Sequence, residues 1–214
     1  MPSTFLQYLF MLSGYPLARW VLPHISSREH AIIVHLTIGI SFCSFIFGQE
    51  ILLAFTMISI GYFILDKNPN EVFKVSFIMN SVIHCIQFCY SSHHEVSNLT
   101  MIVFYKIVAT SFNLDDGRKI KLNDKHLTEN QRSLHLTKKP TFYEWIAYCF
   151  TPFGSISNSF YEFKFFDRLL EIGTKKQTVS DTSKAKAKDR LIRSFFHGLI
   201  YFSFRHPLEF SFYQ

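Results

Sequence analysis

Hydrophobic residues form long stretches along this chain, and charged residues gather between those stretches. A helix of about 20 apolar residues crosses a bilayer, whereas shorter or interrupted stretches form tilted or re-entrant elements. The apolar segments are 5–23, 31–48, 51–65, 75–90, 99–114, 142–160 and 191–204. The pattern predicts an all-α, polytopic transmembrane protein with about five to six membrane helices and one re-entrant or interfacial segment.

The segments 31–48 and 51–65 are separated by only Gln49 and Glu50. Two residues are too few for a turn between two full antiparallel spans that each cross about 30 Å of hydrocarbon. Two arrangements therefore remain open. Either the pair is one long bent helix, or the second segment is a short, tilted span with Gly48 in the turn.

Polar side chains interrupt two of the apolar segments. Asn80, His84 and Gln87 lie within 75–90, so this helix is expected to face protein or a polar cavity rather than lipid. Lys106 is the only charge in the following segment, and a lysine at that depth needs a partner or water. It either pairs with a carboxylate on another helix or contacts an anionic substrate.

The basic residues are concentrated in two stretches. Residues 118–140 contain seven Lys or Arg, and residues 164–193 contain nine. Basic loops stay in the cytosol, so both stretches are predicted to be cytosolic loops on the same side of the membrane. The segment 142–160 between them then cannot cross once, and Pro152 and Gly154 within it favour a re-entrant or interfacial element.

Composition adds little specific chemistry. The net charge of +6 is explained by the basic loops, so no nucleic-acid partner is predicted. The four cysteines lie in apolar segments without the spacing of a metal site, so no metal is predicted. Their positions are Cys43, Cys85, Cys89 and Cys149.

Three stretches in order carry a resemblance to a known family. They are MIVFYKIVATSFNLDDG at 101–117, the segment 127–170 with its acidic-aromatic FYEFKFF, and RLIRSFFHGLIYFSF at 190–204. Their order and spacing, with YPLARWVLP at 15–23, resemble the membrane-bound O-acyltransferase superfamily and its eukaryotic lysophospholipid acyltransferases. No single motif is specific, and Asn158-Ser159 stands where the family usually has Gly-Pro.

The resemblance implies an enzyme of the endoplasmic reticulum membrane that takes part in phospholipid metabolism. It would transfer an acyl group from acyl-CoA, its co-substrate, to the free hydroxyl of a lysophospholipid, with no further cofactor. The partners implied are membrane lipids, acyl-CoA and lysophospholipid. A non-enzymatic membrane scaffold or lipid-binding protein derived from the family is the alternative.

The family's catalytic asparagine and histidine normally lie beyond the matched region. Residues 1–214 are therefore expected to be the N-terminal part of one membrane domain, a fragment inactive alone. His197 is a weaker catalytic candidate, because it falls in the helix after the basic linker, where the family has no catalytic residue. The expected substrate contacts are Asn80, His84, Lys106 and Asn113 along a tunnel, and Lys138 and Lys139 at the acyl-CoA phosphates.

The carboxylates beside these segments are expected to have structural roles. Asp115 and Asp116, followed by Gly117, should close the 99–114 span, and Glu162 lies beside the re-entrant segment. Carboxylates repel the phosphates of acyl-CoA, so they are expected to order the basic loops instead.

Overall fold

The computed structural model describes residues 24–25, 27–90, 95–122, 126–151 and 160–174, together with Asp189 and Arg193. The chain divides into two compact units, Met1–Lys175 and Lys176–Gln214. In the second unit, Arg193 and Asp189 form an ion pair at 2.8 Å. The predicted segments 5–23 and 191–204 lie outside the described residues, apart from Arg193. Every regular element of the described part is a helix, and no strand occurs there, which confirms the all-α prediction for these residues.

The first described helices are separated by a break at Gly48. Helix α2 spans Arg28–Phe47, the 3₁₀ turn η3 spans Gly48–Glu50, and helix α3 spans Ile51–Ile64. Gly48 has a φ of 56°, in the left-handed region that glycine adopts without strain. The two segments are therefore separate helices with Gly48 in the turn. At 20 residues, α2 is about 30 Å long.

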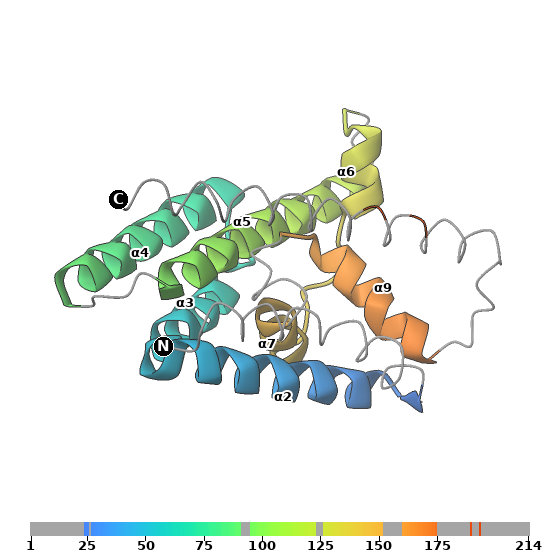
Figure 1. The fold of residues 1–214 in the computed structure, drawn as a ribbon. Coiled ribbons are helices and arrows are strands. Elements are labelled where there is room, and N and C mark those ends of the chain that lie inside the picture. The colour runs from blue at the N-terminus through green and yellow to red at the C-terminus, as the bar shows by residue number, and fades with distance from the viewer. Residues whose placement is uncertain are drawn as a thin grey trace. The chain divides into compact units, whose positions relative to one another are not determined.

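Helices α4 and α5 form an antiparallel hairpin (Figure 1). They span Pro69–Tyr90 and Glu95–Lys121. The rings of Phe73 and Phe77 on α4 pack against Phe104 on α5 with centroids 5.8 and 6.3 Å apart. Both helices extend beyond the predicted segments 75–90 and 99–114.

The prediction that Asp115, Asp116 and Gly117 close the α5 span is wrong. The helix continues through Gly117 to Lys121. The Asp115 carboxylate pairs with Lys119 at 2.8 Å, one turn further along, and such a pair supports the helix beyond the apolar segment.

Contacts at both ends of α3 fix its direction relative to its neighbours. At one end, Gln87 of α4 donates a hydrogen bond to Glu50 at 3.4 Å. At the other, Arg118 near the end of α5 donates to the Asp66 carbonyl, just beyond α3, at 2.8 Å. Helices α3 and α5 therefore run in the same direction, with α4 opposite to both.

Three shorter helices follow among the described residues of the first unit. They are α6 (Glu129–Leu134), α7 (Phe142–Phe150) and α9 (Phe163–Thr174). The stretches 118–140 and 164–193 are thus not simply loops: the first contains the end of α5 and all of α6, and the second contains most of α9. The spacing of Phe163, Phe166 and Leu170 explains α9, because it puts three buried apolar side chains on one helix face.

Helix α7 lies at the centre of this unit, beside α2 and α3 (Figure 1). All six residues from Trp145 to Phe150 are buried, so this helix has no solvent-facing side over that length. Nine residues rise only about 14 Å, which is half of a bilayer's hydrocarbon thickness. Helix α7 therefore cannot cross a membrane by itself.

Candidate functional site at the buried end of α7

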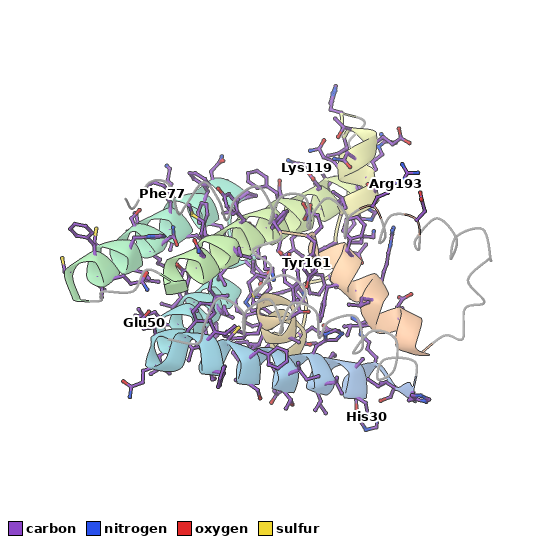
Figure 2. The ribbon with its side chains drawn as sticks, viewed as in Figure 1. His30, Glu50, Phe77, Lys119, Tyr161 and Arg193 are labelled. Atoms are coloured by element: carbon purple, nitrogen blue, oxygen red, sulfur yellow. The ribbon has the colours of Figure 1, made fainter. Side chains whose placement is uncertain are left out.

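The Lys106 side chain reaches from α5 to the C-terminal end of α7. Its ammonium donates hydrogen bonds to the carbonyl oxygens of Tyr148 and Cys149 at 2.7 and 3.2 Å. It also lies 4.5 Å from the ring centroid of Tyr148 and 5.1 Å from that of Tyr161, and Lys106 is fully buried. Figure 2 shows Tyr161 in this central region. We call Lys106, Tyr148, Cys149 and Tyr161 the Lys106 cluster.

This contact satisfies a defined need of the α7 backbone. The last four carbonyl groups of a helix have no partner within it, and the helix dipole concentrates negative charge there. A buried ammonium supplies both hydrogen-bond donors and opposite charge, and the two rings add cation–π attraction. The carboxylate partner expected for Lys106 is therefore wrong: its oxygen partners are main-chain carbonyls 42 and 43 residues away.

Three further contacts hold the same helix end. The Tyr148 hydroxyl donates to the Tyr161 carbonyl at 2.6 Å, and the Trp145 indole donates to the Ile58 carbonyl on α3 at 3.0 Å. Gly39 on α2 lies so close that a Cβ atom there would collide with the Phe150 carbonyl oxygen. The buried end of α7 is thus fixed by α2, α3 and α5 together.

The outer end of α7 is held by charge. Thr141 and Glu144 form a capping box, in which each side chain accepts from the other's backbone N–H. Arg28 at the start of α2 donates to Glu144 at 2.6 Å and to Asp167 on α9 at 2.5 Å. Burial alone would raise the pKa of the Glu144 carboxyl, but hydrogen bonds from Thr141 and Arg28 bring that pKa below its usual value.

Residues on both sides of α7 in the sequence make contacts at one end of the helical unit. Before α7, Lys139 pairs with Asp66 at 2.7 Å, at the end of α3. After it, Lys164 donates to the His135 carbonyl at 3.2 Å. From that end α7 runs inward to the Lys106 cluster.

The structure does not gather the predicted site residues in one place. Asn80 on α4 reaches Met101 Sδ at 3.7 Å, and Asn113 on α5 donates to Glu162 at 2.7 Å. Lys139 pairs with Asp66, and Lys138 is exposed. His84 is half-buried, and its Nε2 has no hydrogen-bond partner. His197 lies outside the described residues.

The carboxylates near these segments contact protein groups. Asp116 accepts a hydrogen bond from Gln131 on α6 at 3.2 Å, and burial raises the pKa of Asp116. Glu162 accepts from Asn113. Asp116 therefore ties α6, within the basic stretch 118–140, to the end of α5.

Two grooves open on the surface of the described residues. One, of about 490 Å³, lies between α2 and the start of α7, with apolar walls from Ile32, Ile33, Leu36 and Tyr143 and a charged end at Arg28 and Glu144. The other, of about 430 Å³, lies between the start of α4 and the end of α5, beside Asn70, Phe112 and Arg118. None of the predicted site residues lines either groove. Within the described part of the chain, no group of His, Cys, Asp or Glu could hold a metal ion.

Sequence reasoning missed the contacts that position α7. The Thr141-x-x-Glu144 spacing is a capping-box signal for a helix start, and it could have been found. The Arg28 bridge and the Gly39 contact carry no such signal, because their partners lie more than 100 residues away in the sequence.

Searches with protein-family models, against curated proteins and against solved structures found no match to this chain.

Proposed function

We propose that this chain forms membrane-embedded helices of a lysophospholipid acyltransferase of the endoplasmic reticulum. The reaction would join the acyl group of acyl-CoA to the free hydroxyl of a lysophospholipid and release the CoA thiol. A general base must take the hydroxyl proton, and donors must stabilise the oxyanion that forms on the thioester carbon. Helices embedded in the bilayer would give both amphiphiles access to one site.

The distribution of apolar and polar side chains supports the membrane placement and carries the proposal. Large apolar side chains are exposed all along α2 to α5, with Phe88 81% and Phe63 73% exposed. Polar side chains on two of these helices, among them Ser76, Asn80 and Lys106, are buried instead. A water-soluble protein rarely exposes so many large apolar side chains on neighbouring helices, whereas lipid favours them.

Helix length supports the same placement. Two helical stretches of the described residues, Arg28–Ile64 and Pro69–Cys89, are long and apolar enough to cross a membrane. Helix α5 is not among them, because Lys106 and the polar residues near its ends lower its hydropathy. The polytopic arrangement therefore rests on the exposed apolar surface together with these two helices.

The acyltransferase assignment rests on the ordered resemblance of 101–117, 127–170 and 190–204 to that family. A short helix buried at mid-depth between longer ones is compatible with a site sheltered from bulk water, as acyl transfer needs. The assignment of Asn80, His84, Lys106 and Asn113 to an acyl-CoA tunnel stays a prediction.

The groove beside α2 favours a second candidate, a lipid-binding protein without catalysis. Its apolar walls at Ile32, Ile33 and Leu36 suit the apolar part of an amphiphile, and its charged end suits the polar part. Such a protein would bind lysophospholipid without consuming acyl-CoA.

One experiment separates these functions. Microsomes from cells lacking the gene are compared with microsomes in which its whole reading frame is restored, using labelled acyl-CoA and a panel of lysophospholipids. If the chain belongs to the enzyme, acyl transfer to one lysophospholipid should be lost in microsomes without the gene and restored when the reading frame is restored. Unchanged transfer with every lysophospholipid would exclude the enzyme, and release of the chain by alkaline carbonate would exclude the membrane placement.

A further inference from the structure

The buried face of α4 is more polar than a helix surrounded by lipid requires. Val72, Ser76, Asn80, Ile83 and Gln87 recur at the spacing of one helix face, and all five are buried. Three of the five are polar, while Ile78 and Val82 on other faces of the same helix are 61% and 50% exposed. The polar side chains of α4 are thus directed inward.

Several of these inward polar atoms lack a protein partner. Ser76 Oγ, Asn80 Oδ1 and His84 Nε2 are buried and make no hydrogen bond. The Asn80 amide nitrogen has Met101 Sδ at 3.7 Å, and a thioether sulfur is a weak acceptor. Burying an unpaired hydroxyl or amide is unfavourable in proteins, and ordered water commonly removes this cost.

These atoms follow one another along the helix from one end towards the middle. Gln87 donates to Glu50 at the break between α2 and α3, and Figure 2 labels Glu50 there. Phe77, next to Ser76, packs on Phe104, which is two residues before Lys106. Gln87 lies eleven positions after Ser76 in the sequence, which is a rise of about 16 Å along the helix. The set therefore extends from the Glu50 end to the level of the Lys106 cluster.

We propose that Ser76, Asn80 and His84 bind a column of water that enters at Glu50 and Gln87. The column satisfies the unpaired atoms along the inner side of α4. This inference rests on the proposed membrane placement, because only within a bilayer is water along that side of the helix unusual.

Thiol reactivity at single positions of α4 tests the column. In a chain whose four cysteines are replaced by serine, Ser76→Cys, Asn80→Cys and His84→Cys are each exposed to a small charged methanethiosulfonate in opened microsomes. The matched controls are Ile78→Cys and Val82→Cys on the outer faces of the same helix. Thiolates form and react only where water reaches, so the three inner sites should react at least about tenfold faster than the controls.

The outcomes separate this inference from the proposed function. Inner sites as slow as the controls would refute the water column and leave the membrane placement intact. Fast reaction at Ile78→Cys and Val82→Cys would show that lipid does not surround α4, and both proposals would fail. Ser76→Cys replaces a single atom and so retains the fold, which makes its rate decisive if the other inner variants do not fold.

Discussion

Lys106 shows how one side chain can complete the end of a buried helix. A helix that ends inside a protein leaves carbonyl groups without partners, and glycine caps or water usually satisfy them. Here the ammonium group binds the Tyr148 and Cys149 carbonyls, and the rings of Tyr148 and Tyr161 lie beside it. These contacts, rather than a carboxylate, stabilise the buried positive charge.

Lys106→Met tests this role because methionine retains the apolar stem and removes the donors. Two buried carbonyls would lose their partner, so we expect the free energy of unfolding to fall by about 1 to 3 kcal/mol. Thermal unfolding of the detergent-solubilised protein measures the change. Lys121→Met is the matched control, because Lys121 also donates to a carbonyl, that of Thr137 at 3.2 Å, but is exposed. Equal melting temperatures for the two variants would contradict a capping role.

Glycine positions give a second prediction at this scale. A Cβ at Gly39 would meet the Phe150 carbonyl, whereas a Cβ at Gly61 would meet the end of the Ile107 side chain. The backbone cannot move aside as a side chain can. Gly39→Ala should therefore lower the free energy of unfolding by about 1 to 3 kcal/mol, and Gly61→Ala should lower it by less. Thermal unfolding of the two variants under the same conditions gives the comparison. A greater loss for Gly61→Ala would show that α7 is not packed tightly against α2.

At the scale of elements, α7 depends on its neighbours for its position. Its outer end is held by Arg28, which bridges Glu144 to Asp167 and so joins α2, α7 and α9. Its inner end is held by Lys106 from α5. A nine-residue helix is only marginally stable alone, so these tertiary contacts account for its presence.

The Arg28 bridge predicts a pH dependence of stability. The pKa of Glu144 is lowered by folding from its ordinary value of 4.5, so the unfolded chain binds more protons in acid. The stabilisation is present above pH 4.5 and is lost as pH falls through the lowered value. Glu144→Gln should therefore lower the free energy of unfolding by about 1 to 2 kcal/mol at neutral pH, a value between those for exposed and for buried ion pairs. The difference from the unmodified protein should shrink below the ordinary pKa, and a constant difference in melting temperature from pH 7 to pH 3 would argue against the charge pair.

The sequence predicted some elements well and others poorly, for physical reasons. The interior position of the polar side chains of α4 followed from the cost of exposing Asn80 and Gln87 to lipid, and both are buried. The end of α5 was predicted too early because Asp115 and Gly117 resemble a helix stop. In the structure the helix continues past them: Asp115 pairs with Lys119 one turn further along, and the backbone of Leu136 lies close to Gly117.

Helix α9 was not predicted, because its charged residues indicated a basic loop and its apolar residues are spaced three and four apart between them. The partner of Lys106 could not be predicted at all, since main-chain carbonyls carry no residue-specific signal.

At the scale of the whole helical unit, α2 to α5 alternate in direction. The start of α2 contacts the outer end of α7 through Arg28, and that outer end lies beside Asp66 at the end of α3. Glu50 and Gln87 mark the opposite end. Three basic side chains are exposed in the segments beside this end, Arg132, Lys138 and Arg168. Those segments include Lys139, which pairs with Asp66, and Lys164, which donates to the His135 carbonyl.

Topology follows from this arrangement if the helices lie in a bilayer. The Asp66 end should be cytosolic, because basic residues stay on that side, and the Glu50 end should be lumenal. Single cysteines at Lys138 and Arg168, one on each side of α7 in the sequence, should both react with a membrane-impermeant maleimide added outside sealed microsomes. A cysteine at Gln49, which is exposed in the break between α2 and α3, should react only after the membrane is opened. Opposite protection of Lys138→Cys and Arg168→Cys would mean that the segment 142–160 crosses the bilayer. Reaction of all three cysteines in sealed microsomes would mean that α2 and α3 do not span it.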